Sequence, residues 1–202
     1  MQLLDVQQGT LEWLRARVGV PTASEFKRII TKTGKPSAQA EGYLHQIVAE
    51  WLINQPIDGE TSGWMERGSD LEAEAVAFYE FQFDRTTSKA GFCLTDDGAF
   101  GCSPDRLVGE DGGLEIKCPS AKIHVGYMLG VPHEEYIPQV QGCMLVTGRR
   151  WWDFISYNPL LPVVYHRYER DDAYIETLSG LLADFDEQIA EAKRKLAPHR
   201  LG

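Results

Sequence analysis

Two carboxylates and one amine lie close together in the segment 103–117, in an order that suits metal-dependent chemistry. The run Ser103-Pro104-Asp105 is followed ten positions later by Glu115-Ile116-Lys117. Carboxylate oxygens are the ligands that Mg²⁺ and Mn²⁺ prefer, and these ions keep open positions for water and for a phosphate oxygen. An ammonium beside such an ion, here that of Lys117, can orient the attacking water, help to deprotonate it and offset charge in the transition state. The three side chains therefore predict metal-assisted hydrolysis.

The surrounding residues predict a β-hairpin that positions these groups. We expect one strand over 100–108, a turn over 109–113 whose Gly and Asp residues suit positive φ angles, and a second strand over 114–118. Because side chains alternate along a strand, Glu115 and Lys117 share one face. Pro104 interrupts the first strand, so Asp105 can turn toward Glu115. The motif alone is equally typical of an exposed hairpin with a surface Glu–Lys pair, and both interpretations stay open at this point.

The composition indicates one soluble domain over residues 1–202, with 43% hydrophobic and 25% charged residues. No apolar run approaches the roughly 20 residues that span a bilayer, and the N-terminus lacks a signal-peptide pattern, so we expect a cytoplasmic protein without membrane contact. The net charge of −10 argues against a general nucleic-acid coat protein. It does not exclude a DNA enzyme, because a metal site built from Asp and Glu is itself acidic. The cysteines, which form no C-x-x-C pair, are expected to be reduced core thiols: Cys93, Cys102, Cys118 and Cys143.

Apolar periodicity predicts an α/β fold, with a small mixed β-sheet flanked by helices. Thr22 and Glu25 match a capping box, so a helix is expected over 22–30. Further helices are predicted over 43–54, 69–81, 121–129, 136–146 and 174–189, and further strands over 151–157 and 163–169.

Glu72 falls inside the apolar arc of the helix predicted over 69–81. With about 100° per residue, it lies between Tyr79 and Val76 on the helical projection. A buried carboxylate needs a partner. That partner is either a metal ion or an arginine such as Arg67, and the pattern does not decide between them.

A second group of residues suits a phosphate. Arg15 and Arg17 precede a helix expected to open at Thr22 or Ser24, and an arginine beside free main-chain N–H groups forms an anion site. Surface arginines and ordinary helix caps give the same pattern. Gln141, in a segment suited to burial, either binds a phosphate or the attacking water, or is an amide satisfied within the core.

Taken together, the order of these signals resembles the phage λ-type 5′→3′ alkaline exonucleases of the PD-(D/E)xK nuclease superfamily. The resemblance extends from about Trp13 to the C-terminal helix. It rests on Arg17-Val18-Gly19-Val20, Thr22-Ala23-Ser24, Gly68-x3-Glu72, Ser103-Pro104-Asp105, Gly113-Leu114-Glu115-Ile116-Lys117-Cys118-Pro119, Tyr136-x2-Gln139-Val140-Gln141 and Tyr157-Asn158-Pro159.

The resemblance implies a restriction-endonuclease-like core, two Mg²⁺ ions per active site, for which Mn²⁺ can substitute, and a ring-shaped homotrimer threaded by DNA. By position, Asp105 and Glu115 would ligate metal, the Ile116 carbonyl and Glu72 would complete the ligand set, and Lys117 would act on the water. The pocket for the 5′-terminal phosphate would consist of Arg17, Thr22, Ser24, Ser103 and Gln141. The chain departs from the family over 64–67 and in the loop 31–37. Met65 is the candidate for the apolar side chain that separates the duplex, or else fills a gap in the core.

The implied activity is a processive, Mg²⁺-dependent 5′→3′ exonuclease on linear duplex DNA with 5′-phosphate ends. It would release 5′-mononucleotides and leave 3′ overhangs for a single-strand annealing protein in recombination and double-strand break repair. The expected location is the cytoplasm of a bacterial host, with a phage or prophage gene. The alternatives are a PD-(D/E)xK endonuclease, a helicase-associated nuclease, a catalytically inactive DNA-end-binding protein, and an acidic α/β protein with no nuclease role.

Overall fold

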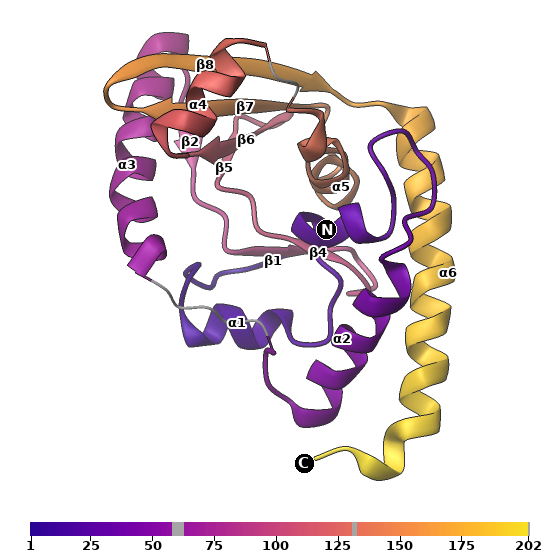
Figure 1. Ribbon diagram of the computed structural model, residues 1–202. Helices are drawn as coiled ribbons and strands as arrows, with labels where there is room; N and C mark the ends of the chain where they lie inside the picture. The colour runs from indigo at the N-terminus through magenta and orange to yellow at the C-terminus, as the bar shows by residue number, and fades with distance from the viewer. Residues whose placement is uncertain (58–62, 131–132, 202) are drawn as a thin grey trace.

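The strands of the described residues form two β-sheets (Figure 1), where one small mixed sheet was expected. The structure is a computed structural model that describes residues 1–57, 63–130 and 133–201, without the side chains of 63–70. The larger sheet has the order β2-β5-β6-β7-β8, with β2 (Thr87–Ser88), β5 (Arg106–Val108), β6 (Gly112–Lys117), β7 (Trp151–Asn158) and β8 (Leu161–Glu169). The smaller sheet has the order β1-β3-β4, with β1 (Gln2–Leu4), β3 (Phe92–Leu94) and β4 (Gly101–Cys102).

Helices surround the two sheets (Figure 1). The α-helices are α1 (Leu11–Arg17), α2 (Ala40–Ile53), α3 (Gly63–Phe83), α4 (Ala121–Met128), α5 (Ile137–Thr147) and α6 (Asp172–Leu196), and short 3₁₀ helices are η1 (Ala23–Arg28), η2 (Glu134–Tyr136) and η3 (Ala197–His199). The predicted helix over 22–30 is the 3₁₀ helix η1, and its capping box does not form, because Thr22 makes no side-chain cap hydrogen bond. The other predicted helices are confirmed, with α3 beginning earlier than expected.

The predicted hairpin is present, but its first strand is divided between the two sheets. β4 belongs to the smaller sheet, and β5 pairs with β6 in the larger one. The residues 103–105, which contain Pro104, connect them. β6 pairs in parallel with β7, with Glu115 opposite Phe154, and the connection between these strands runs through α4 and α5. β6 therefore lies inside the sheet, with a strand hydrogen-bonded on each side.

The two faces of β6 have different environments, as the alternation predicted. Leu114 and Ile116 pack with Ala75 and Tyr79 of α3 in one apolar cluster. Glu115 lies on the other face, which α5 covers, and it is 2% exposed. One strand thus supplies both an anchor in the core and a buried carboxylate.

A buried carboxylate on the α3 face fixes β7 to its neighbours. Asp153, with 0% exposure, accepts hydrogen bonds from the Tyr79 hydroxyl at 2.6 Å and the Tyr165 hydroxyl at 3.0 Å. Arg167 donates to the same carboxylate through Nε at 2.7 Å and through Nη2 at 2.8 Å. The charge is therefore both neutralised and fully hydrogen-bonded.

We expect Asp153→Ala to lower the free energy of unfolding by about 1–3 kcal/mol, because it leaves the buried Tyr79 hydroxyl without its hydrogen-bond partner. Urea denaturation monitored by circular dichroism measures this. The matched control is Asp172→Ala, which removes the exposed partner of Arg170 and should cause little change. Equal losses of unfolding free energy in the two variants would contradict the stabilising role assigned to Asp153.

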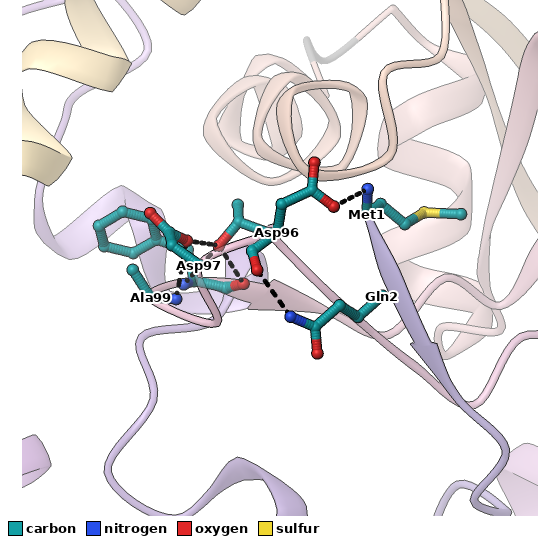
Figure 2. A network of polar contacts seen from close by, with 7 residues as sticks. Met1, Gln2, Asp96, Asp97 and Ala99 are labelled. Carbon is teal, nitrogen blue, oxygen red and sulfur yellow. Dashed lines mark hydrogen bonds and ion pairs between the residues drawn. The ribbon is translucent and has the colours of Figure 1, made fainter.

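A polar network holds the smaller sheet together near the turn between β3 and β4 (Figure 2). The Met1 ammonium lies 2.6 Å from Asp96 Oδ1, and Gln2 Nε2 donates to the Asp96 carbonyl at 2.7 Å. Asp97 Oδ1 accepts from the Thr95 hydroxyl and, at 3.0 Å, from the Ala99 N–H. These contacts fix the turn that leads into β4, and hence the segment 103–105 that follows it.

The amphipathic C-terminal helix is confirmed as α6, which packs on α2 and α5. Its apolar stripe enters the main core, where the Tyr43 and Phe185 rings stack at 5.6 Å between centroids. The helix begins with a cap, because Asp171 Oδ1 accepts from the Tyr174 N–H at 3.0 Å. Within the described residues, no helix combines the length and the apolar character that crossing a membrane requires.

Candidate active site

Asp105, Glu115 and Lys117 are brought together at the centre of the larger sheet. Asp105 lies in the connection between β4 and β5, and its Oδ2 accepts from the main-chain N–H of Ile116 at 2.6 Å. The Lys117 ammonium lies 2.5 Å from Glu115 Oε1. The hairpin therefore places both carboxylates and the amine at one location, as their spacing predicted.

The charges of these three groups influence one another strongly. Burial, reinforced by the negative charge of Glu115, raises the pKa of Asp105 well above its usual range, although Lys117 and the Ile116 N–H act in the opposite direction. Burial alone would lower the pKa of Lys117, but the carboxylates of Glu115 and Asp105 outweigh it and raise that pKa. Lys117 is therefore held as an ammonium, and Asp105 lies where an additional cation would favour its charged form.

The residues present fit a divalent metal ion. Glu115 Oε2 is buried and has no hydrogen-bond partner, although an unpaired buried carboxylate oxygen is costly. In the part of the chain whose side chains are described, no group of three or more His, Cys, Asp or Glu residues is arranged to hold a metal. Mg²⁺ does not require such a group, since it is commonly bound through one or two carboxylates and keeps several waters. Asp105 and the free oxygen of Glu115 supply that number.

Glu72 lies near enough to Asp105 for its charge to raise the pKa of that carboxyl, and its role as a metal ligand stays a prediction. Its side chain is 36% exposed, and its Oε1 lies 3.4 Å from Arg106 Nη1. The expectation of a Glu72 inside the apolar arc was wrong, because the buried side of α3 runs through Ala75 and Tyr79 and leaves Glu72 at the edge. Among the residues whose side chains are described, the partner is an arginine, Arg106 on β5; the side chain of Arg67 lies outside them. Ile116 contributes its N–H to Asp105, and the role of its carbonyl as a metal ligand stays a prediction.

Four of the five residues predicted for the phosphate pocket form a chain of contacts through Trp13. The Trp13 indole N–H donates to Ser103 Oγ at 2.8 Å, and the Arg17 guanidinium lies over the Trp13 ring at 4.1 Å from its centroid. Arg17 Nη2 donates to Thr22 Oγ1 at 3.4 Å, and that hydroxyl lies 3.3 Å from Ser24 Oγ. A guanidinium and three hydroxyls are thereby grouped at one location, which is a donor set suited to a phosphate.

Gln141 lies outside this group. Its side-chain amide donates to the Glu169 carbonyl at 2.9 Å and accepts from the Asp171 N–H at 3.1 Å, so both polar atoms are used in the core. The assignment of Gln141 to the phosphate pocket is therefore corrected, and the alternative of a satisfied core amide holds. Gln139 is the glutamine at the site, because its Nε2 donates to Glu115 Oε1 at 2.8 Å.

A small cavity of about 130 Å³ borders one hydroxyl of the proposed phosphate pocket, that of Ser24. It is lined by Ser24, Lys27, Glu135, Tyr136 and Gln139. The cavity is bordered by Ser24 from the first group and by Gln139, which contacts Glu115.

The side chain of Met65, the candidate for separating the duplex, lies outside the described residues. Trp13 and Gln139 were quoted as parts of motifs but received no role. Their positions in the sequence could have indicated that they belong to the site: Trp13 precedes Arg17 by one helical turn, and Gln139 lies two residues before Gln141.

A family model and solved structures of exonucleases match this chain. Residues 12–150 match the family model of the YqaJ-like viral recombinase domain. Two crystal structures of LHK-Exo, an alkaline exonuclease from Laribacter hongkongensis, one of them in complex with dAMP, are 36% identical to this chain, with TM-scores of 0.76 and 0.77. Each comparison covers 94% of this chain and 99% of that chain. No curated protein matches the chain.

A phage-related exonuclease from Haemophilus somnus 129PT is 14% identical, with a TM-score of 0.68 over 88% of this chain and 96% of that chain, which is a likeness of fold. The predicted restriction-endonuclease-like, PD-(D/E)xK α/β core is confirmed by these matches. Since the family model covers more than half of the residues and LHK-Exo matches nearly the whole length, the chain belongs to the YqaJ-like viral recombinase family.

Proposed function

We propose that the protein is a Mg²⁺-dependent, processive 5′→3′ exonuclease that degrades linear duplex DNA from 5′-phosphorylated ends. It releases 5′-mononucleotides and leaves 3′ overhangs. One observation carries the proposal: Asp105, Glu115 and Lys117 form a cluster in which one buried Glu115 oxygen has no hydrogen-bond partner. Gln139, which contacts Glu115, lines a small cavity together with Ser24 of the proposed phosphate pocket. The similarity to an alkaline exonuclease crystallised with dAMP, itself a 5′-mononucleotide, supports the same chemistry.

The residues divide the work between binding and hydrolysis. Arg17, with the hydroxyls of Thr22, Ser24 and Ser103, binds the 5′-terminal phosphate and so sets which phosphodiester reaches the carboxylates. Lys117 donates to the attacking water and offsets the charge that develops on the phosphate. Asp105 and Glu115 would hold Mg²⁺, and the Ile116 carbonyl and Glu72 would complete the ligand set. When bound, the metal supplies an activated water and stabilises the leaving oxygen.

Assembly and partners follow from the family resemblance. We propose a homotrimeric ring around the duplex, because encircling DNA gives processivity to a chain whose net charge is −10. The 3′ overhang is then a substrate for a single-strand annealing protein in recombination and double-strand break repair. The setting would be the cytoplasm of a bacterial host, with the gene carried by a phage or prophage.

The direct test is digestion of linear duplexes that carry a 5′-phosphate on one strand only, with Mg²⁺ or with EDTA. We expect the phosphorylated strand to disappear as mononucleotides with Mg²⁺, the other strand to remain, and EDTA to stop the reaction. Removal of both strands at equal rates would refute the directional proposal. Covalently closed circular DNA is the control, because an endonuclease nicks it and an exonuclease leaves it intact.

A further inference from the structure

We propose that Tyr136 is a positioning residue of the nuclease reaction, whose ring holds the Lys117 ammonium beside Glu115. The proposal rests on the function proposed above and adds to it a residue outside the metal-binding and phosphate-binding sets. Tyr136 closes η2 and immediately precedes α5, the helix that carries Gln139. Two elements of the site, the ring and the glutamine, thus come from one short segment.

The Lys117 ammonium is bounded on two sides. Glu115 Oε1 lies 2.5 Å from Nζ, and the centroid of the Tyr136 ring lies 5.2 Å from the same nitrogen. A cation at that distance from an aromatic face is attracted by the negative potential of the ring. Since the lysine side chain is 32% exposed and has four rotatable bonds, the ring restricts positions that the single ion pair would leave accessible.

The ring is itself held firmly. It stacks on Phe154 with 5.0 Å between centroids and 30° between planes. Phe154 is the direct register partner of Glu115 in the parallel β6–β7 pair. The same pair of strands therefore fixes the carboxylate on one side of the ammonium and the aromatic ring on the other. The Tyr136 hydroxyl points to a different neighbour, the Tyr127 hydroxyl at 3.2 Å.

Tyr136 also lines the cavity of about 130 Å³ together with Ser24 and Gln139. The ring thus lines the same cavity as one hydroxyl of the proposed phosphate pocket and the glutamine that contacts Glu115. Its removal would give the lysine stem a new direction in which to move, away from Glu115. The expected consequence is a slower hydrolytic step, with little change in how tightly the DNA end is bound.

The experiment compares Tyr136→Phe with Tyr136→Leu on a linear duplex with 5′-phosphate ends. Phe keeps the ring face and the stack on Phe154, so we expect kcat within about two-fold of wild type. Leu removes the ring face, so kcat should fall about ten-fold while KM changes less than two-fold, as the loss of a partly desolvated cation–π contact predicts. Tyr157→Leu, which removes a partly buried ring of β7 on the α3 face, is the matched control and should leave kcat unchanged.

A second measurement needs neither DNA nor metal. Urea unfolding of Tyr136→Leu, Lys117→Gln and the double variant forms a double-mutant cycle, and the two substitutions should be non-additive. Additive effects, equal loss of kcat in the Phe and Leu variants, or a change in KM in place of kcat would each overturn the proposal. If the wild type leaves 5′-phosphorylated duplexes intact, the nuclease function fails, whereas the cycle still reports whether ring and ammonium interact.

Discussion

Lys117→Ala is expected to lower kcat by about 10³-fold while the affinity for DNA ends, measured in the absence of Mg²⁺, stays close to that of wild type. The ammonium contacts Glu115 and is influenced by the charge of Asp105. Under the proposed mechanism, its loss removes the donor to the attacking water and the charge that offsets the transition state. The donors that we propose for the 5′-phosphate lie on other elements and remain. Single-turnover cleavage of an end-labelled duplex measures the rate, and a fluorescence-anisotropy titration measures binding.

Lys122→Ala is the matched control for this substitution, because Lys122 is an exposed lysine in the first turn of α4. It should retain full activity. Thermal melting of the Lys117→Ala protein is needed alongside, since the buried Glu115 keeps only Gln139 as a partner. A folded Lys117→Ala protein that still turns over would remove Lys117 from the mechanism.

Arg17→Ala is expected to reduce the preference for 5′-phosphate over 5′-hydroxyl ends by about 10- to 100-fold, the range for losing a charge-assisted hydrogen bond. Arg17 is held against the Trp13 ring and contacts Thr22, so its guanidinium is oriented before the ligand arrives. The preference is the ratio of kcat/KM values for two duplexes that differ only in the terminal group.

Arg15→Ala provides the comparison for Arg17. Arg15 lies on the same helix but is exposed, so its removal should weaken binding slightly and equally for both kinds of end. A wild type that degrades both ends at the same rate would show that the pocket has been assigned to the wrong residues.

Local geometry explains why part of the site could be predicted from sequence. The alternation of Glu115 and Lys117 with Leu114 and Ile116 follows from backbone geometry alone, and the structure confirms it. This alternation holds once residues 112–117 form a strand. The position of Asp105 depends in addition on the division of the first strand between the two sheets.

Long-range packing decided the features that were predicted wrongly. Gln139 and Gln141 are about 200° apart on a helix, and which of them meets Glu115 depends on how α5 is rotated against the sheet. The capping box at Thr22 failed because the Thr22 side chain contacts Arg17 and Ser24. Glu72 lies near Arg106 of β5, and periodicity cannot predict that β5 lies beside this part of α3. The division into two sheets likewise depends on pairings between distant segments.

The two glutamines of α5 connect this helix to two other parts of the structure. Gln139 donates to the Glu115 carboxylate of β6, and Gln141 forms hydrogen bonds with the main chain of Glu169 and Asp171, between β8 and α6. A protein that binds the start of the C-terminal helix therefore contacts a main-chain segment that α5 connects to Glu115 through these two side chains. Binding there is a route by which the rate of hydrolysis can change without any contact to the DNA.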